Sequence, residues 1–148
     1  MNDEYDIIVD ELDEETCWRL LARAGFGRVG FVKEEAVIVL PVNSAVSDGR
    51  VIFRTAGDAS LAAAGDGSVV AFEADHTDRV AESGWSVVVR GRGRETDPPE
   101  PHAEESVVPW APGVRDHWVR IDAETISGRR ITQADDSTSR WWRLSASG

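Results

Sequence analysis

The chain has few of the residues on which thiol chemistry and nucleic-acid binding depend. It contains one cysteine, one methionine and one lysine among 148 residues. The single thiol, Cys17, excludes an internal disulfide and a metal site built from several thiolates, and it agrees with a reducing compartment. Lys33 and fifteen arginines stand against 27 acidic residues, which gives a net charge of −11. Such a charge repels nucleic acid and anionic lipid, so we expect no nucleic-acid partner.

Long apolar runs are also missing from the sequence. No run approaches the roughly 18 apolar residues of a membrane-spanning helix. The first fifteen residues contain eight acidic side chains and no basic one, unlike a signal or transit peptide. We therefore expect a cytoplasmic protein with no membrane partner. With 41% apolar composition, 148 residues suffice for one globular domain with its own core.

Residues 36–55 predict a β-hairpin, around which the rest of the chain is organised. Residues 36–43 are an apolar, largely β-branched strand, Asp48-Gly49 supplies turn residues, and residues 51–54 return as the partner strand. Pro41 lacks an N–H, so it belongs at a sheet edge or at a bulge. The hairpin ends in Arg54-Thr55-Ala56-Gly57, where a guanidinium, a hydroxyl and backbone amides can hold a phosphate.

A helix is predicted before the hairpin, from an N-cap at Asp13 to a stop at Gly25, with Cys17 on its apolar face. Just after it, the glycines at positions 25, 27 and 30 match the G-x-G-x-x-G pattern of dinucleotide-binding folds. That fingerprint needs a strand before the glycines and a helix after them. Here the order is reversed, so we expect glycines that end a helix and bend a strand over residues 26–32.

The remaining elements predict a mainly β, antiparallel fold. A short helix is expected at residues 59–64, followed by strands at 68–74 and 84–95, and then by a last pair of strands at 117–121 and 124–131. The apolar residues 7–9 fit either an edge strand or an arm laid on a partner. We expect one domain over residues 1–131, in which 1–11 form an N-terminal arm, and a polar tail over 132–148.

Two further patterns bear on partners and chemistry. Arg90, Arg92 and Arg94 alternate along one strand, which is typical of a solvated face or of a face that pairs with acidic segments of a second subunit. The histidines at positions 76, 102 and 117 have no spacing that would let two of them share a metal, so we expect no metal site. No serine has the context of a hydrolase nucleophile.

The ordered residue strings resemble a known family over about residues 10–131. They are Gly-Phe-Gly-Arg-Val-Gly, Leu-Pro-Val-Asn, Val-Ile-Phe-Arg-Thr, Gly-Trp-Ser-Val-Val-Val-Arg-Gly-Arg, Trp-Ala-Pro-Gly, His-Trp-Val-Arg-Ile and Ser-Gly-Arg-Arg-Ile. This set is similar to the pyridoxamine 5'-phosphate oxidase-like flavin-binding split barrels, in the branch common in actinobacteria. The resemblance implies a six-stranded antiparallel split β-barrel with a Greek key and a few short helices. It also implies a homodimer with FMN in each of two clefts between the subunits.

The resemblance implies a role for specific residues in cofactor binding. The strand ending at Asn43 would lie along the isoalloxazine, the end of the next strand would contact the ring edge and phosphate, and an aromatic side chain of the other subunit would cover the ring. The implied cofactor-binding residues are Pro41, Val42, Asn43, Phe53, Arg54, Thr55, Ser60, Ser86 and Trp110.

One position departs from the family and leaves three functions open. Relatives follow the Arg-Thr turn with a serine and a basic residue, whereas this chain has Asp58-Ala59-Ser60. The first function is an FMN-dependent oxidoreductase that passes a hydride to or from a small molecule. The second is an F420-dependent reductase on the same scaffold, and the third is a non-catalytic split barrel without cofactor. No vitamin B6 site is recognisable, so we do not expect a genuine pyridoxamine phosphate oxidase.

Apolar strand faces predict the homodimer independently. Residues 37–42 and 87–89 carry more apolar surface than one short helix can cover, so we expect a second subunit to cover the remainder.

Overall fold

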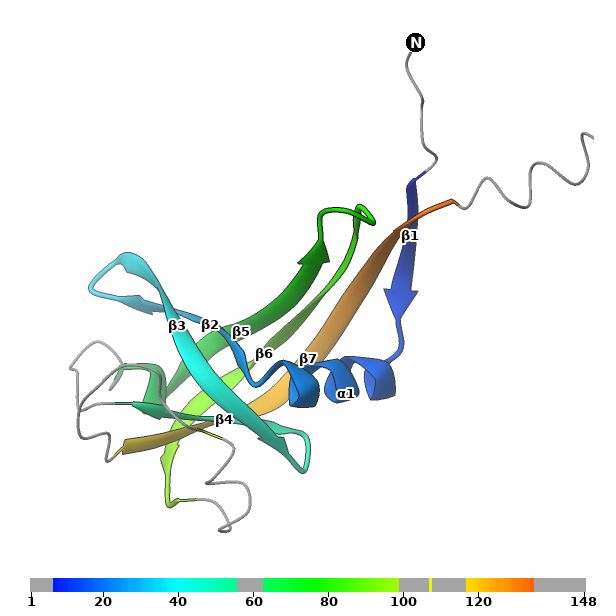
Figure 1. Cartoon of the computed structure of the whole chain (residues 1–148). Coiled ribbons are helices and arrows are strands. Elements are labelled where there is room, and N and C mark those ends of the chain that lie inside the picture. Colours follow the sequence, from blue (N-terminus) through cyan, green and yellow to red (C-terminus); the bar gives the residue numbers. More distant parts are fainter. Residues whose placement is uncertain (1–6, 56–62, 99–106, 108–116, 135–148) are drawn as a thin grey trace, which may run out of the picture.

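The computed structural model describes residues 7–55, 63–98, 107 and 117–134 of the chain. In chain order its elements are β1 (Ile7–Leu12), α1 (Glu14–Ala24), β2 (Phe26–Lys33), β3 (Ala36–Ser47), β4 (Arg50–Thr55), the short 3₁₀ helix η1 (Ala63–Gly65), β5 (Asp66–Asp78), β6 (Ser83–Thr96) and β7 (His117–Gln133). Strands dominate the described residues, as expected for the mainly β class (Figure 1).

The strands form one antiparallel sheet that closes into a barrel. Their order is β1-β7-β4-β3-β2-β5-β6, and a further pairing of β7 with β6 joins six strands in a ring. The neighbours β2, β3 and β4 are consecutive, and β5 returns to lie beside β2, which is a Greek key. The predicted six-stranded barrel is therefore confirmed, with β1 as a seventh strand outside the ring.

Strand β7 is the longest element and corrects one prediction. We expected two strands, at residues 117–121 and 124–131, and the structure has one strand of 17 residues. The predicted break coincides with a shift in register, because Gly91 lies opposite Ala123 and Arg90 opposite Thr125. Glu124 is thus an extra residue in β7, and a β-bulge accommodates it while the pairing with β6 continues on both sides.

The outer edge of β7 is shared by two strands. Residues 117–122 pair with β4, and residues 128–133 pair with β1, from Ile7 opposite Gln133 to Leu12 opposite Gly128 (Figure 1). Residues 7–9, for which a strand and an arm were both open, are therefore an edge strand of the same chain. Their side chains remain exposed, with Ile7 at 66% and Val9 at 56%.

Helix α1 has the predicted ends and lies against β7 and β3. The Asp13 carboxylate accepts a hydrogen bond from the Thr16 N–H at 2.7 Å, and hydrogen bonding by the Thr16 side chain, followed by that of its backbone, lowers the pKa of Asp13. Gly25 follows the helix at φ 61°, in the left-handed conformation that favours glycine. The helix places Cys17 and Leu21 in the barrel core. Because a helix precedes Gly25 and β2 follows it, the glycines are not a dinucleotide-binding loop.

Two tight turns fix the register of β2, β3 and β4. Glu34 and Glu35 have φ of 50° and 65°, and Asp48 and Gly49 have φ of 50° and 71°. Positive φ at both central residues is typical of the type I′ turn, which joins twisted antiparallel strands. The predicted hairpin at Asp48-Gly49 is confirmed. The predicted short helix at residues 59–64 is only partly described, since the 3₁₀ helix occupies residues 63–65 and residues 59–62 lie outside the described part.

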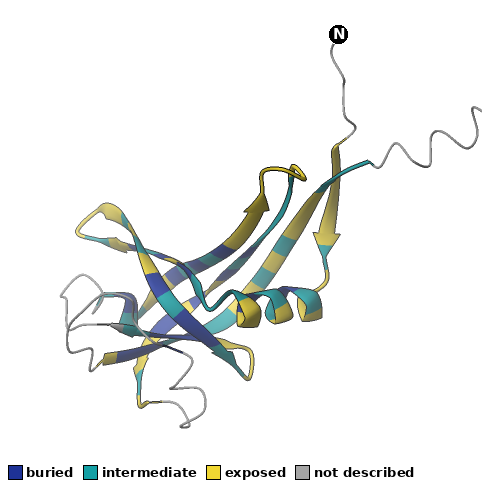
Figure 2. Ribbon diagram, in the orientation of Figure 1, coloured by how far each residue is buried: buried dark blue, intermediate teal, exposed yellow. Residues whose placement is uncertain are grey.

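The inward faces of the strands make one hydrophobic core (Figure 2). Phe53, Phe72, Val87 and Val89 are at most 1% exposed within it. This corrects the reasoning behind the dimer prediction, because Val87 and Val89 point into the barrel and are not available to a second subunit. In the described part of the chain, no helix is long and apolar enough to cross a membrane.

Packing at Gly27 yields a testable prediction. A Cβ atom at this position would collide with the Phe72 ring and the Glu73 carbonyl. Gly27→Ala should therefore lower the free energy of unfolding by about 1–3 kcal/mol, because the core has no room for the methyl group.

Gly30 provides the matched control on the same strand, since the atoms nearest to a Cβ there lie at 3.9 and 4.0 Å. Gly30→Ala should change the free energy of unfolding by no more than about 0.5 kcal/mol. Urea denaturation of both variants beside wild type measures the difference, and equal midpoints would show that the predicted collision is not real.

Candidate functional site

The predicted site residues of β3 lie where, among the described residues, that strand is paired on one side only. Residues 36–43 pair with β2, whereas the pairing with β4 begins at Ser44. Pro41 is exposed and lies opposite Arg28 in an uninterrupted ladder, so it occupies a sheet edge, not a bulge. Val42 points into the core and is 7% exposed. Within the described residues this edge of β3 has no neighbouring strand, so its backbone groups can face a ligand, and Asn43 is half-buried beside it.

Arg54, near the end of β4, projects from the outer face of the barrel. Its guanidinium lies over the Trp118 ring, 5.3 Å from the ring centroid, a distance typical of a cation–π contact. The two residues are partners in the β4–β7 ladder. The neighbouring Phe53 is fully buried, so only its backbone can reach a ligand. Arg54 is thus held in place by an aromatic neighbour that the sequence did not single out.

Ser86 lies in a hollow at the other end of the barrel. This hollow of about 510 Å³ is lined by residues of β5, β6 and β7 and of the hairpin between β5 and β6. Trp85 and Ile131 give it apolar walls, and Ser86 and Arg129, which are ladder partners, contribute polar groups. None of the predicted site residues of β3 and β4 lines this hollow.

The structure therefore separates the predicted residues into two groups. Arg54 lies beside Trp118 and Ser86 beside Arg129, at opposite parts of β7. At about 3.4 Å per residue, these two positions are roughly 37 Å apart along the strand. Ser60 and Trp110 lie outside the described residues, as do the acidic Asp58 and the side chain of Thr55.

A charged group joins β2 to β5 beside the hollow of Ser86, because Asp75 lines that hollow and is the ladder partner of Ser86. The Arg28 guanidinium lies 3.0 Å from the Glu73 carboxylate and 3.4 Å from that of Asp75. Burial, followed by the neighbouring Asp75, raises the pKa of Glu73, and Arg28 opposes this effect. Glu73 is thus a partner of Arg28. Sequence reasoning missed this group because its members come from two strands whose pairing no local pattern reveals.

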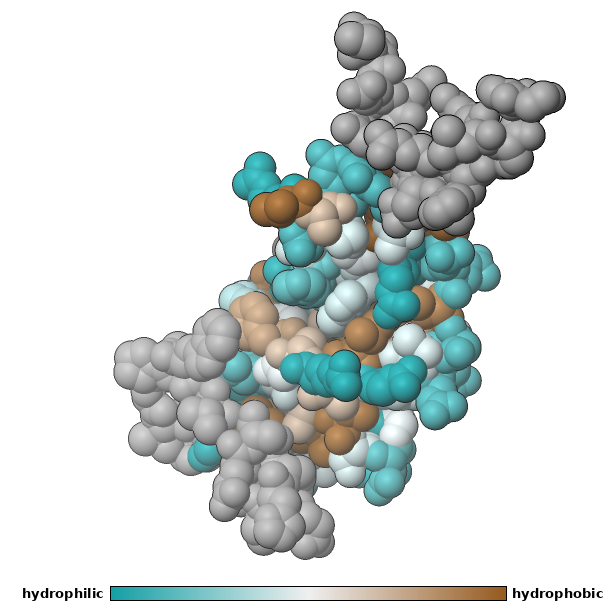
Figure 3. All heavy atoms as spheres, turned by 45° about the vertical axis from the view of Figure 1, so that its right-hand side comes forward, coloured by the Kyte–Doolittle hydropathy of each residue, from teal (hydrophilic) through white to brown (hydrophobic). Residues whose placement is uncertain are grey.

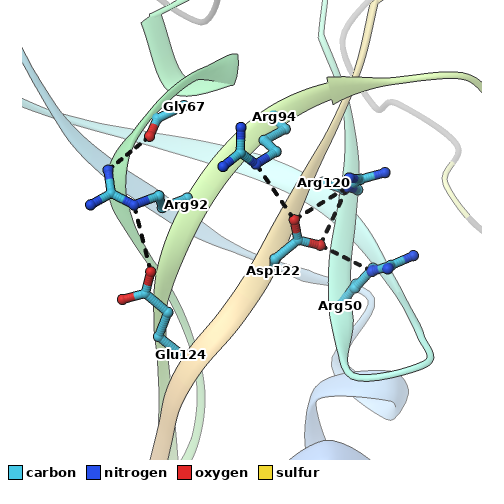
Figure 4. Close-up of polar contacts among 7 residues, drawn as sticks. All are labelled: Arg50, Gly67, Arg92, Arg94, Arg120, Asp122 and Glu124. Atoms are coloured by element: carbon cyan, nitrogen blue, oxygen red, sulfur yellow. Dashed lines mark hydrogen bonds and ion pairs between the residues drawn. The ribbon is translucent and has the colours of Figure 1, made fainter.

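The arginine ladder of β6 lies on a basic face of β4, β7 and β6 (Figure 4). Asp122 has Arg50 at 3.0 Å, Arg120 at 3.3 Å and Arg94 at 3.8 Å. Arg92 pairs with Glu124 at 3.6 Å and donates to the Gly67 carbonyl at 3.0 Å. The expectation of a solvated strand face is confirmed, because Arg90, Arg92 and Arg94 are all exposed, and Arg92 and Arg94 pair with carboxylates of the same chain.

Apolar side chains are exposed on the outer face of β2, β3 and β5. Val32 is 62% exposed, Val37 78%, Val39 59% and Val69 56%, and Val32 and Val37 are ladder partners. We call these four residues the valine face. A space-filling view of one side of the molecule also shows apolar surface exposed between hydrophilic side chains (Figure 3).

Cys17 and His117, two chemically reactive residues in the described part of the chain, show no catalytic arrangement. Burial raises the pKa of the Cys17 thiol, so this residue behaves as part of the core. The His117 ring contacts the Glu95 carboxylate at 2.9 Å on the surface. Within residues 7–55, 63–98, 107 and 117–134, no three histidine, cysteine or acidic side chains are grouped closely enough to hold a metal ion.

Comparisons with known proteins agree with this architecture. Residues 13–130 match the model of the family described as pyridoxamine 5'-phosphate oxidase. The uncharacterized Mycobacterium tuberculosis protein Rv0080 is 41% identical over 137 residues, which cover 88% of this chain and 90% of that protein.

Solved structures of similar size share the fold. The FAD-binding protein from Mycobacterium smegmatis is 34% identical, with a TM-score of 0.66 over 83% of this chain and 98% of that one. A conserved protein of unknown function from Corynebacterium diphtheriae is 29% identical, with a TM-score of 0.66 over 85% and 98% of the two chains. The barrel, the matched residues and these relatives together show that the chain belongs to the pyridoxamine 5'-phosphate oxidase family.

Proposed function

We propose that this chain binds a flavin nucleotide, FMN, in a cleft between two subunits and is a small oxidoreductase acting on a small molecule. The observation that carries the proposal is the 34% identity, over almost the whole domain, to an FAD-binding protein of Mycobacterium smegmatis. FAD contains the isoalloxazine ring and the phosphate of FMN. A site that binds FAD and a site that binds FMN therefore contact the same ring and the same first phosphate.

The described residues fit such a group. The one-sided edge of β3 next to Pro41 offers backbone donors and acceptors for the polar edge of the ring. Arg54 offers a charged fork for the phosphate, and its stacking on Trp118 limits its freedom. A bound flavin supplies hydride transfer through its ring, and the protein holds and orients it. We identify no general acid or base among the described side chains, so we assign the protein a binding and orienting role.

The separation of Arg54 and Ser86 supports a shared cleft. Within one chain the two residues belong to opposite parts of β7. If both contact one flavin, as the resemblance to split barrels implies, they must come from different subunits. Ser86 would then bring its hollow, with Trp85 and Arg129, to the ring bound at the other subunit's Arg54. The proposed homodimer and the proposed flavin site therefore depend on each other.

A split barrel without cofactor is the second candidate, and Asp58 favours it. In the sequence, Asp58 follows Arg54 by four residues, and Ser60 stands near the position at which the family resemblance leads us to expect a basic residue. A phosphate of nearly two negative charges is repelled by such a carboxylate. F420 fits less well, since its polyanionic tail would meet a protein of net charge −11.

The dimer is testable at the valine face, because an exposed apolar surface of this kind is typical of an interface. Val37→Asp should shift the protein from dimer to monomer in sedimentation velocity at micromolar concentration, since a carboxylate would be buried without a partner. Val80→Asp is the matched control, because Val80 is 97% exposed at a hairpin tip. A wild-type protein that sediments as a monomer would contradict the dimer and the shared cleft.

Arg54 is the first test of the flavin site. Arg54→Ala should weaken FMN binding by about 1.5–3 kcal/mol, roughly tenfold to over a hundredfold, because a charge-assisted hydrogen bond to the phosphate is lost. Arg92→Ala is the control, since Arg92 lies on a different strand and pairs with Glu124. Fluorescence quenching of FMN measures both affinities, and sedimentation checks that the dimer persists. If Arg54→Ala binds FMN as tightly as wild type does, the proposal that Arg54 holds the flavin phosphate is wrong.

Ser60 allows the opposite change. Ser60→Lys should tighten FMN binding by about tenfold, because it adds a cation where family members carry one. If wild type loses its flavin during purification, this variant should retain it and show the flavin absorbance bands. Ser60→Gln adds length without charge and should leave the affinity near that of wild type. A colourless wild type whose Ser60→Lys variant also fails to bind FMN would favour the barrel without cofactor.

A further inference from the structure

The basic face of the barrel has a centre that the flavin proposal does not use. Asp122, on the outer face of β7, has a guanidinium group of β4, one of β6 and one of β7 around its carboxylate (Figure 4). We call Arg50, Arg94, Arg120 and Asp122 the Asp122 cluster. Ladder pairing creates it, because Arg50 and Arg92 lie on either side of Asp122, and Arg94 lies beside Arg120.

All three arginines approach Asp122 through Nε. The Nε atoms of Arg50 and Arg120 lie 3.0 and 3.3 Å from Oδ1, and that of Arg94 lies 3.8 Å from Oδ2. The terminal nitrogens point away from the carboxylate, with those of Arg50 and Arg120 on the same side of it (Figure 4). Among the described residues these terminal nitrogens have no hydrogen-bond partner. Asp122 thus contacts the Nε atom of each guanidinium group, and the two terminal nitrogens of each group remain available to a ligand.

Charge and exposure favour an anion at these fork ends. The cluster has three cations and one carboxylate, which gives a charge of +2 in a protein of net charge −11. The side chains of Arg50 and Arg120 are 48% and 33% exposed, so a solute can reach them. The neighbouring Arg92 differs, because Glu124 neutralises it and the Gly67 carbonyl occupies one terminal nitrogen.

Asp122 itself shows that the cluster is organised by charge. Its Oδ1 is buried and, within the described residues, accepts no hydrogen bond, although two guanidinium nitrogens lie at 3.0 and 3.3 Å. A buried carboxylate oxygen of this kind is costly unless nearby cations compensate it. Asp122 therefore keeps Arg50 and Arg120 close together against their mutual repulsion. Two adjacent guanidinium forks are the arrangement that binds a phosphoryl group with two hydrogen bonds from each.

We propose that Arg50 and Arg120, held by Asp122, form a binding site for a phosphoryl group of a small molecule, separate from the flavin site. Arg50 and Arg54 are four residues apart on β4, about 14 Å along the strand. The site takes an oxyanion with two negative charges, which matches the charge of the cluster. It does not depend on whether a flavin binds, so the two proposals can fail separately.

The test is titration of the full-length protein with pyrophosphate and with inorganic phosphate. Isothermal titration calorimetry gives the affinity, and the ¹H–¹⁵N Nε signals of the arginine side chains report which guanidinium groups respond. Chloride at matched ionic strength corrects for screening. Arg50→Gln and Arg120→Gln should each weaken binding of pyrophosphate by about tenfold or more, because each removes a charged fork. Arg92→Gln, on the same face, should change it less than about twofold.

Each result bears directly on the proposal. Shifts of the Arg50 and Arg120 Nε signals, with loss of affinity in these two variants only, support the site. An equal loss in Arg92→Gln would show a diffuse charge effect and overturn it. No heat and no Nε shift up to millimolar pyrophosphate would overturn it as well. Unchanged FMN affinity in Arg50→Gln is expected, and a fall there equal to that of Arg54→Ala would show one site, not two.

Discussion

The fold depends on the pairing of β7 along both of its edges. On one edge β6 follows it from Thr96 opposite Trp118 to Gly84 opposite Ile131, and on the other edge β4 and then β1 divide its length. This strand therefore closes the barrel and also carries the strand outside it. The bulge at Glu124 is what makes one continuous strand possible, since it lets β7 change register without losing its neighbour.

The groups on which the two proposals rest are distributed along the same strand. Trp118 supports Arg54 near its beginning, Asp122 gathers three arginines in its middle, and Arg129 lines the hollow of Ser86 towards its end. Each group contains side chains from at least two strands. These groups therefore form only when β7 pairs with its neighbours, which also closes the barrel.

Local features of the fold could be predicted from the sequence, because short-range physics decides them. Asp13 and Gly25 set the ends of α1, and Asp48-Gly49 sets the turn of the hairpin, through contacts within a few residues. The division of β7 into two strands was wrong because Asp122 and Ala123 are poor strand formers on their own. Cross-strand pairing with Arg50 and Arg92 outweighs that preference, and no local pattern shows it.

The candidate site was predictable in its parts but not in its arrangement. Arg54 was identified at a strand end, yet its contact with Trp118 needs the β4–β7 register. We predicted that Val87 and Val89 contribute to a dimer interface, but both are buried in the barrel. The sequence of a strand does not show which of its two faces points into the core. The Asp122 cluster was hidden for the same reason, since arginines far apart in the chain meet only in the folded sheet.

The position of β1 has a consequence for how the chain folds. Ile7 pairs with Gln133, so strands near the two ends of the described chain are neighbours. Contacts between residues so distant in sequence slow folding, because a long loop must close before they stabilise anything. During synthesis on the ribosome, β1 is made before β7, and it cannot form the pairing seen here until residues 128–133 of β7 have been added. Among the described strands, β1 is therefore expected to pair late.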